Sequence, residues 1–553
     1  MNAARDTAAD APTDAAVDPC ADTDTDVIVV GAGPTGLLLA AELALGGVRV
    51  RILERRAAAQ RDSRALTLHP RSIELMDQRG LVERFLAHGR PVPGWHFAGL
   101  DTRLDFSALD TRHGYTLFLA QARTEQLLAE RTRELDVTIR RGYEVTGLRQ
   151  NAGSDGEGGP GGTDGGGVEV AVRGPDGTVE TVRARYVVGC DGGRSVVRRA
   201  AGIGFPGTDE TLSGALGDFA TVDPAALDRA RAHGVLAVPL DPQDAYPDGP
   251  EEGRAGGLTR LVLLDPERMQ TPSAEPLTLD EFRASLLRIC GTDCGVARPR
   301  WLSRFGNATR LAARYRAGRV LLAGDAAHIH FPAAGQGLNT GLQDAMNLGW
   351  KLAAEINGWA PPRLLDSYHA ERHPVGRAVT ENTEIQTLLA ELTLLPQYRR
   401  PAAALRALMA ELLGIEEVNR HLAGLVSALD TAYPPDDAAA DPLVGRRMPD
   451  IALTATGSAA IRVYELLPPG RFVLLDLAGD EEMRQSVEKA WGTRVTALTV
   501  TEHDPRTDLD GVREILVRPD GHIAWATRTT AVQTRRTERV RALTHWAGLP
   551  AGG

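Results

Sequence analysis

The chain has 553 residues, a length typical of three or four domains and too great for a single small binding module. Apolar residues make up 43% of it and charged residues 24%, which excludes wholesale disorder and predicts a sizeable folded core. The formal net charge of −11 leaves no excess positive charge to hold a phosphate polymer, so nucleic acid is not an expected partner.

The N-terminal residues are rich in Ala, Asp and Thr and contain neither the basic nor the apolar region of a secretory signal. We expect residues 1–25 to form a disordered acidic lead. Residues 27–48 are apolar, but the glycines, the proline and Glu42 within them favour a strand, a turn and a helix over a membrane span. Four cysteines are too few for a disulfide framework in a chain of this length. Together these features predict a cytoplasmic protein with no membrane partner.

The apolar pattern predicts alternating strands and helices in the first 200 residues. The predicted strands cover 26–30, 48–53, 168–172 and 179–188, and the predicted helices cover 37–45, 70–88 and 124–134. Thr124 is the expected cap of the third helix, and a turn over 174–177 joins the last two strands. Residues 151–167, nine of which are glycine, are expected to form a flexible surface loop because glycine loses the most entropy on ordering.

The remaining chain divides by composition. Residues 206–300 are rich in Pro and Asp, with short strand-like runs, and are expected to form a separate substrate-binding domain. A buried strand is predicted over 319–323 and a long helix over 345–356, and helical character continues to residue 430. A small α/β domain is predicted at the C-terminus, with strands over 471–476, 493–500 and 514–517 and a hairpin turn over 519–522. The predicted domains are a lead (1–25), a discontinuous domain (26–205 and 301–380), a substrate-binding domain (206–300), a helical segment (381–430), a linker (431–442) and a C-terminal domain (443–553).

A glycine-rich string, Gly31-Ala32-Gly33-Pro34-Thr35-Gly36, lies between the first predicted strand and helix. Its first glycine permits a tight turn, its second lets a pyrophosphate approach the backbone, and its third lets the helix pack close to the strand. The second strand ends at Glu54-Arg55, 23 residues after Gly31, where a carboxylate can accept hydrogen bonds from a ribose. The string in this context predicts a dinucleotide site.

Two further motifs carry polar residues at strand ends. One is Val187-Val-Gly-Cys-Asp191-Gly-Gly-Arg-Ser195, and the other is Gly324-Asp325-Ala-Ala-His328, followed by Pro332, Gly335, Gly337, Leu338 and Asn339. Asp325 follows a buried strand, so its carboxylate can accept from a ribityl or ribose hydroxyl; a helix cap is the alternative. Residues 335–339 precede the predicted long helix, whose free N–H groups and positive dipole end can face an anion. Asp191 is open to a second interpretation as a turn residue.

With these three ordered motifs, residues 25–380 resemble the FAD-dependent class A aromatic hydroxylases, the para-hydroxybenzoate hydroxylase superfamily. The C-terminal residues are similar to the thioredoxin-like tail of the branch that hydroxylates aromatic polyketides. The resemblance implies an α/β fold: a Rossmann-type FAD-binding domain, an interleaved α+β substrate domain and a C-terminal thioredoxin-like domain. That last domain contains no cysteine, so disulfide exchange is excluded there.

The resemblance also implies site residues. Arg64, near the flavin diphosphate and mobile ring, and Pro332, beside the ring, would have positioning roles, and no acid or base is assigned. A surface ion pair remains the alternative for Arg64, and a solvated loop residue for Gln121. The implied cofactor-binding residues are Gly31, Gly33, Pro34, Thr35, Gly36, Glu54, Arg55, Arg64, Gln121, Asp191, Gly324, Asp325, Pro332, Gly335, Gly337, Leu338 and Asn339.

The implied activity is an NAD(P)H- and O2-dependent monooxygenase that hydroxylates an aromatic-polyketide-type phenol or quinone through a flavin C4a-hydroperoxide. Without a second glycine-rich string, NAD(P)H is expected to bind only transiently. The alternatives are Baeyer–Villiger oxidation of a polycyclic ketone, hydroxylation of a small phenylpropionate-type phenol, a flavin-binding protein that never activates oxygen and, last, a flavin-free dehydrogenase. The choice of NADPH or NADH and a homo-oligomeric state are left open.

Four other polar side chains invite a functional interpretation. His328 and His330 lack the accompanying ligands of a metal site, so no metal is predicted and a structural role is favoured for His328. His113 and Tyr115 are candidates for deprotonating a phenol, with a structural role favoured for each.

Overall fold

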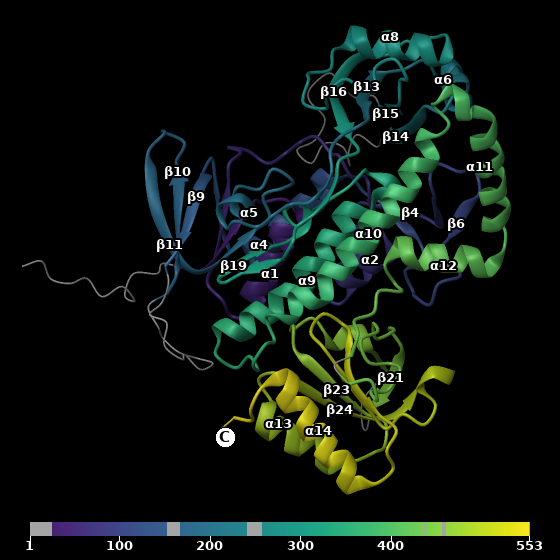
Figure 1. Ribbon diagram of the computed structural model, residues 1–553. Coiled ribbons are helices and arrows are strands. Elements are labelled where there is room, and N and C mark those ends of the chain that lie inside the picture. Colours follow the sequence, from purple (N-terminus) through teal and green to yellow (C-terminus); the bar gives the residue numbers. More distant parts are fainter. Residues whose placement is uncertain (1–24, 152–165, 241–256, 436, 456–459, 552–553) are drawn as a thin grey trace, which may run out of the picture.

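The computed structural model describes residues 25–151, 166–240, 257–435, 437–455 and 460–551. The predicted lead, apart from Thr25, and most of the glycine-rich loop lie outside these residues. Figure 1 shows a small four-stranded sheet and the C-terminal domain at opposite ends of the molecule. The long helices α9 (Gln336–Ile356) and α10 (Ser367–Glu391) lie between them.

The largest sheet in the described part of the chain has eight strands. Its main order is β18-β19-β11-β1-β2-β8, with β10 paired to β11 and β9 paired to β10. The strands are β1 (Thr25–Val30), β2 (Val50–Glu54), β8 (Thr138–Arg141), β9 (Glu144–Gln150), β10 (Val168–Arg173), β11 (Val179–Gly189), β18 (Arg316–Ala317) and β19 (Val320–Leu322). Strands β19, β11, β1, β2 and β8 are parallel neighbours. The apolar runs of β19, β1 and the end of β11 are buried on both faces, as in other parallel sheets.

Helices cover this sheet. Helix α1 (Pro34–Leu45) follows β1, begins with a proline at its first turn and is buried from Gly36 to Leu43. It packs closely against α9, where the absent side chain of Gly349 leaves room for Glu42. The other helices of this region are α2 (Pro70–Asp77), α3 (Val82–Leu86), α4 (Gln121–Glu134) and α5 (Val196–Ala200).

The helix predicted over 70–88 is wrong as one element, because it is broken between α2 and α3. Gly80 adopts a φ of +65°, which ends the first helix in the left-handed region. The Leu81 amide then bonds the Met76 carbonyl at 2.8 Å.

The start predicted for the third helix is also wrong. Helix α4 begins at Gln121, so Thr124 lies inside it rather than at its cap. The cap comes from a distant loop: the Ser63 Oγ accepts a hydrogen bond from the Ala122 amide at 3.0 Å. A cap supplied through tertiary structure leaves no local pattern to read.

The long helix α9 begins at Gln336, nine residues before the predicted start. Gly335, with a φ of +71°, is its N-cap. Gly337, Leu338 and Asn339, expected just before the helix, therefore form its first turn.

The region after residue 205 forms a second, antiparallel sheet of order β14-β15-β13-β16. Its strands are β13 (Ser213–Thr221), β14 (Leu236–Leu240), β15 (Leu258–Leu263) and β16 (Ala297–Gly306), and helices α6 (Pro224–Ala232) and α8 (Leu279–Cys290) cover it. The buried rings of Phe219 and Phe282 pack in its core with centroids 5.0 Å apart. Strand β16 continues to Gly306, so a boundary at residue 300 falls inside a strand.

Three small sheets and a helical arm connect these parts. Helix α10 crosses residue 380 and is followed by α11 (Arg399–Leu413) and α12 (Glu416–Ser427). The small sheets combine β3 (Thr67–Leu68), β7 (Thr116–Phe118) and β4 (Arg90–Val92); β5 (Gly94–His96) and β6 (Arg103–Asp105); and β12 (Gly207–Thr208), β17 (Thr309–Leu311) and β20 (His328–Ile329).

The C-terminal domain is a six-stranded sheet of order β22-β21-β24-β23-β25-β26. Its elements are β21 (Ala452–Ala455), β22 (Ile461–Arg462), β23 (Phe472–Asp476), α13 (Glu481–Trp491), β24 (Val495–His503), β25 (Glu514–Val517), β26 (Ile523–Thr527) and α14 (Val532–Ala547). The sheet packs on α9, and the rings of Trp350 and Phe472 meet edge to face with centroids 5.4 Å apart. No helix in the residues described above has both the length and the apolar character needed to cross a bilayer.

Candidate functional site

The three sequence motifs meet because they follow three neighbouring parallel strands. The glycine-rich string follows β1, the Asp191 motif follows β11 and the Gly324-Asp325 turn follows β19. Since β19, β11 and β1 are adjacent and parallel, all three motifs lie at one edge of the sheet. Ligands of open α/β sheets bind at this carboxyl edge.

Glycines allow these motifs to approach without side chains between them. A Cβ at Gly31 would lie 2.4 Å from the Cys190 carbonyl oxygen, and one at Gly36 would lie 2.1 Å from the Gly31 carbonyl oxygen. A Cβ at Gly324 would lie 2.7 Å from the Thr35 Oγ1, so the first and third motifs also touch. By contrast, a Cβ at Gly33 would meet nothing within 4 Å. The string therefore packs tightly where it meets protein and stays open at Gly33.

Glu54 lies at the end of β2 with its side chain buried. Its Oε2 accepts a hydrogen bond from the Ala32 amide at 2.8 Å, and its Oε1 accepts one from the Arg56 amide at 2.9 Å. A carboxylate has further lone pairs on both oxygens, so these bonds orient Glu54 and leave capacity for a ribose. The neighbouring Arg55 is exposed.

Asp191 fulfils its structural interpretation with one oxygen only. Its Oδ2 accepts hydrogen bonds from the amides of Val196 and Val197, at 2.7 and 3.2 Å, at the start of α5. Its Oδ1 is buried and has no hydrogen-bond partner. A buried carboxylate oxygen is costly to leave unpaired, so this atom marks a place where a ligand donor belongs.

Asp325 is accessible although most residues around it are buried. Desolvation by the surrounding protein raises its pKa, against the opposing fields of His328 and Arg64. Arg64 is exposed, and its effect on Asp325 places the guanidinium within electrostatic reach of the Gly324-Asp325 turn. The assignment of Arg64 to the cofactor site stays a prediction.

The first turn of α9 forms another part of the site. Pro332 is exposed, whereas Ala334 is fully buried and adopts a φ of +52°, a left-handed conformation that costs a non-glycine residue about 1–2 kcal/mol. The side chain of Asn339 is used within the protein: its Oδ1 accepts from the His69 amide at 2.8 Å and its Nδ2 donates to the Gly335 carbonyl at 2.9 Å. Asn339 therefore holds the segment around His69 against the start of α9.

Gln121 joins the loop around Arg64 to α4. Its Oε1 accepts a hydrogen bond from the Ala65 amide at 3.2 Å, and its Nε2 donates to Glu125 at 2.8 Å. Burial raises the pKa of Glu125 to about 7. Both polar ends of Gln121 thus have protein partners.

A buried polar group behind the Gly324-Asp325 turn was missed by the sequence analysis. Asp344, on α9, accepts hydrogen bonds from the Gly324 amide at 3.0 Å and from the Arg372 Nε at 2.7 Å, and its Oδ2 lies 2.8 Å from the His328 Nε2. Burial alone would raise the pKa of Asp344, but Arg372 and His328 hold it below the ordinary value. The structural role favoured for His328 is met by this contact.

Three neutral imidazoles were also missed as a group, and two of them, His69 and His330, lie beside Gly335 and Gly337. Burial lowers the pKa values of His69, His96 and His330 to about 4, so all three are neutral at pH 7. Each has one buried ring nitrogen without a hydrogen-bond partner: His69 Nε2, His96 Nδ1 and His330 Nε2. Only His330 was noticed in the sequence, because nothing local predicts that the other two are buried.

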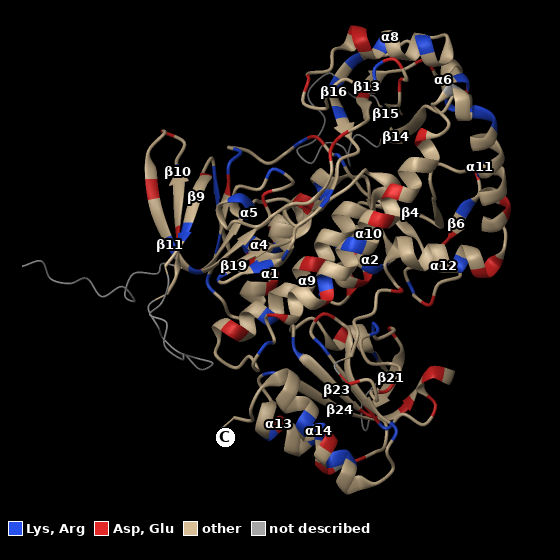
Figure 2. Cartoon of the chain, viewed as in Figure 1, with Lys and Arg blue, Asp and Glu red and all other residues tan. Residues whose placement is uncertain are grey.

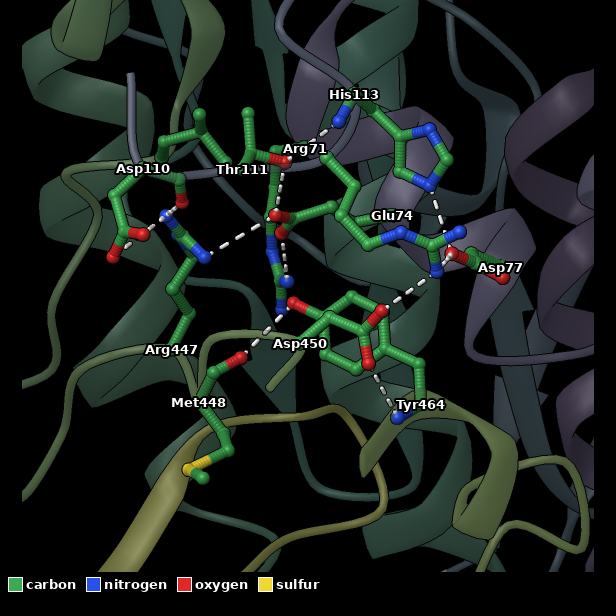
Figure 3. A network of polar contacts seen from close by, with 12 residues as sticks. Arg71, Glu74, Asp77, Asp110, Thr111, His113, Arg447, Met448, Asp450 and Tyr464 are labelled. Carbon is green, nitrogen blue, oxygen red and sulfur yellow. Dashed lines mark hydrogen bonds and ion pairs between the residues drawn. The ribbon is translucent and has the colours of Figure 1, made fainter. Parts of the chain in front are cut away.

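His113 and Tyr115 lie elsewhere. The His113 Nε2 is 2.8 Å from Asp77, beside the C-terminal domain (Figure 3). Its Nδ1 is 2.9 Å from the Tyr115 hydroxyl. Their candidacy for deprotonating a substrate at the strand edge is therefore not supported. Among the residues that the structure describes, no group of three or more His, Cys, Asp and Glu side chains is arranged to hold a metal ion.

The residues at the carboxyl edge fit a flavin dinucleotide. The first-turn N–H groups of α1 and α9 have no partners within their helices and can bind a diphosphate and the electron-rich edge of a flavin ring. The open space at Gly33 and the unpaired Oδ1 of Asp191 are what such a ligand would fill and satisfy.

Comparison with known proteins agrees with this geometry. Residues 24–383 match the family described as FAD binding domain, and residues 441–550 match the family described as aromatic-ring hydroxylase, C-terminal. The chain belongs to the FAD-dependent aromatic-ring hydroxylases. It is a monooxygenase with FAD as cofactor and NAD(P)H as co-substrate.

Three similar proteins illustrate the relationship. An uncharacterized aromatic compound monooxygenase of Bacillus subtilis (strain 168) is 45% identical over 92% of this chain and 95% of the relative. A rifampicin monooxygenase of Streptomyces venezuelae is 47% identical over 91% of this chain and 95% of the relative. The solved structure of an anhydrotetracycline hydroxylase from Streptomyces rimosus is 42% identical and has a TM-score of 0.81, covering 95% of this chain and 100% of that one.

A first prediction concerns Gly33. Gly33→Ala should fold like the parent, because its Cβ would meet no protein atom within 4 Å, yet bind FAD at least about tenfold more weakly, since the methyl occupies the space a diphosphate needs. Flavin fluorescence titration of the apoprotein measures the affinity. Gly147→Ala on β9, which also meets nothing within 4 Å, is the control. Equal FAD affinities of the two variants would contradict the assignment.

A second prediction concerns pH. Because the pKa values of His69, His96 and His330 fall from 6.5 to about 4 on folding, the unfolded chain binds protons that the folded chain does not as the pH falls below 6.5. The apoprotein should therefore lose stability between pH 6.5 and about 4, by up to about 3 kcal/mol for the fully buried His69. Thermal midpoints across this range measure the effect. The thermal midpoint of His330→Gln should fall less steeply with pH than that of the parent. An unchanged slope would contradict the prediction.

Proposed function

We propose that this monooxygenase hydroxylates a polycyclic phenol or quinone of the aromatic-polyketide type. Named relatives support the substrate class, since one carries the name rifampicin monooxygenase and another the name anhydrotetracycline hydroxylase. The observation that carries the proposal is the set of unpaired polar atoms in an otherwise apolar region beside Ala334. A large ring system with few hydroxyl or carbonyl groups matches such a surface.

The apolar part of the proposed substrate site comes from several elements. Ala334 shares a buried cluster with Phe97, Phe106 and Leu389, from the segments around β5 and β6 and from α10. On the side of the four-stranded sheet, Leu66 packs with Phe118, Leu240 and Leu258. Residues 206–300, the proposed substrate-binding domain, would thus cover the flavin from one side.

The polar part comes from atoms that lack partners. The Trp95 Nε1, the Gln386 Nε2 and the ring nitrogens of His69 and His96 are buried and unpaired. Gln386 is already oriented, because its Oε1 accepts a hydrogen bond from the Ala98 amide at 3.0 Å. Neutral imidazoles can accept a hydrogen bond from a phenol, while the indole and amide N–H groups can donate to a quinone oxygen.

We propose that the cofactor is held by the residues the sequence indicates. The α1 N-terminus with Gly31, Gly33, Pro34, Thr35 and Gly36 would hold the diphosphate, and Glu54, beside Arg55, the adenosine ribose. Asp191 and Gly324-Asp325 would hold the ribityl chain of the flavin. Gly335, Gly337, Leu338 and Asn339 would present the α9 N-terminus to the ring, with Pro332, Arg64 and Gln121 beside it.

When bound, FAD would supply the redox chemistry, namely acceptance of hydride from NAD(P)H and activation of O2, with one oxygen atom going to the substrate and the other to water. The residues of this chain orient and shield. The α9 N-terminus stabilises negative charge on the ring by about 0.3–1 kcal/mol through its dipole. Neutral histidines hold the substrate without adding a positive charge, and apolar walls exclude water.

We also propose a thioredoxin-like fold for the C-terminal domain, a transient nicotinamide site and a cytoplasmic location. The order β23-α13-β24 followed by β25-β26-α14, with β24, β23, β25 and β26 adjacent, supports the fold. A homo-oligomeric assembly is not part of the proposal.

The third prediction tests the reaction. Purified protein should be yellow and should convert a tetracyclic phenol, NADPH and O2 to a product heavier by one oxygen, with NADPH consumption stimulated by the substrate. Mass spectrometry and NMR of the product distinguish a new ring hydroxyl from a lactone. A lactone would indicate Baeyer–Villiger oxidation instead of hydroxylation. Preference for a one-ring phenol would contradict the polycyclic substrate class, and substrate turnover without oxygen uptake would overturn the proposal.

The fourth prediction tests the polar subsite. His96→Phe keeps an aromatic ring but removes both nitrogens, and we expect KM for a polycyclic phenol to rise about tenfold, with a smaller change in kcat, for one lost buried hydrogen bond of about 1.4 kcal/mol. His233→Phe, at an exposed position after α6, is the control. Equal KM values in both variants would contradict the placement of His96 in the substrate site.

A further inference from the structure

Buried charged residues pair between α9 and α10. Lys351 and Arg372 are fully buried, Glu371 is 8% exposed, and Asn347 is buried between them. Figure 2 shows both acidic and basic residues along these two helices. Burying a charge costs free energy unless the charge is paired, so the partners of these side chains indicate their structural role.

Two of the partners come from the C-terminal domain. Arg518 donates two hydrogen bonds to Glu371, at 2.8 and 2.9 Å. The Asp520 Oδ2 accepts from the Trp350 Nε1 at 3.2 Å, and Asp520 is also paired with Arg518. Lys351 completes the group by donating to Glu371 at 2.7 Å. The turn between β25 and β26 is thereby fixed to both long helices.

A second buried set of contacts leads to the FAD site. Arg372, adjacent to Glu371 in the chain, donates a hydrogen bond to Asp344, and Asp344 accepts another from the Gly324 amide. Arg372 also donates to the Thr340 carbonyl at 3.2 Å, near the start of α9. The buried contacts thus reach both the Gly324-Asp325 turn and the helix end that faces the flavin ring.

Tyr433 is a second link between Arg372 and the C-terminal domain. Its hydroxyl accepts a hydrogen bond from the Arg372 Nη1 at 3.3 Å. Its ring stacks on His522 with centroids 4.4 Å apart, and the Arg518 guanidinium lies 5.2 Å from the ring centre.

Charge is balanced within this group. Arg518, Lys351 and Arg372 are cations, and Glu371, Asp520 and Asp344 are anions, in surroundings that include the apolar cluster of Trp350 and Phe472. Although burial alone would raise the pKa of Glu371, Arg518 and Lys351 lower it to about 2. Removing one member would leave an opposite charge buried without its partner, which is strongly destabilising.

We propose that the C-terminal domain is a positioning element of the FAD site, acting through Arg518, Glu371, Arg372 and Tyr433 on Asp344 and the Gly324-Asp325 turn. The domain has no cysteine for redox exchange, and its buried contacts lead to the flavin-facing ends of β19 and α9. Arg518, Glu371, Arg372 and Tyr433 are positioning residues, because each acts on the cofactor through Asp344 and the backbone.

Other contacts hold the same domain but stop short of the FAD site. Arg447 of the C-terminal domain bonds Glu74 on α2 at 3.2 Å, and Arg112, in the loop between β6 and β7, bonds Asp450 of the C-terminal domain at 2.9 Å (Figure 3). At the rim, Arg506 donates two hydrogen bonds to Asp110, at 2.9 and 2.8 Å. These pairs provide matched controls for attachment of the domain as such.

The first experiment is a double-mutant cycle on the full chain. Arg518→Gln and Glu371→Gln should each weaken FAD binding by the apoprotein at least tenfold. The double variant should lose less than the product of the two, because the two charges that it leaves behind, Lys351 and Asp520, are opposite in sign and still attract each other. Arg506→Gln should stay within twofold of the parent. Flavin fluorescence gives the dissociation constant, and the reduction potential of bound FAD is measured in parallel. The proposal is overturned if the single variants lower the thermal midpoint of the apoprotein while FAD affinity and potential remain those of the parent.

A milder pair keeps the test decisive if the charge variants fail to fold. Tyr433→Phe removes only the hydroxyl that accepts from Arg372, whereas Tyr464→Phe removes an equally buried hydroxyl that donates to the Met448 carbonyl at 2.9 Å. We expect FAD to bind Tyr433→Phe at least threefold more weakly and Tyr464→Phe as tightly as the parent. Equal affinities in the two variants would sink the proposal. Because the readout is FAD binding, this result is independent of which substrate the enzyme oxidises.

Discussion

The whole site depends on how closely three parallel strands can bring their ends together. Strands β19, β11 and β1 deliver one motif each, and the contacts between Gly31 and Cys190 and between Gly324 and Thr35 leave no room for a further carbon atom. Parallel neighbours need long crossover connections, so motifs separated by more than 100 residues can reach the same edge. Backbone packed against backbone leaves its N–H groups free for a ligand instead of covering them with side chains. Position in the sheet and glycine content therefore act together.

Two kinds of buried polar group surround this edge. The side chains of Asp344, Arg372 and Glu371 form buried ion pairs, which hold backbone segments in place. The Asp191 Oδ1 and the ring nitrogens of His69 and His96 are unpaired. An unpaired buried polar atom costs about 1–3 kcal/mol. A protein keeps such atoms where a ligand satisfies them, and this separates the binding surface from its supports without any bound ligand.

The C-terminal domain extends this support. Its apolar contact with Trp350 makes it part of the same folded body, and the polar contacts within that interface give it a defined register on α9. Apolar burial is non-directional, whereas the two-point pairing of Arg518 with Glu371 fixes orientation. A domain without redox chemistry of its own can thus influence the redox site by geometry.

The sequence by itself determined the β-α-β unit and the three motifs, because these rest on local requirements: a glycine where no side chain fits, a carboxylate at a strand end, a proline at a helix start. The FAD-dependent class followed from the family resemblance that those motifs carry. The sequence analysis placed the start of α9 nine residues late and joined α2 to α3. The left-handed conformations of Gly335 and Gly80, which set these helix ends, cannot be recognised from the local sequence. Only the tertiary structure decided the roles of Asp344, His69 and Glu371. Each is set by burial against other elements: the partners of Asp344 lie 16 to 28 residues away, Arg518 lies 147 residues from Glu371, and Asn339 lies 270 residues from His69. Local sequence carries no record of that environment.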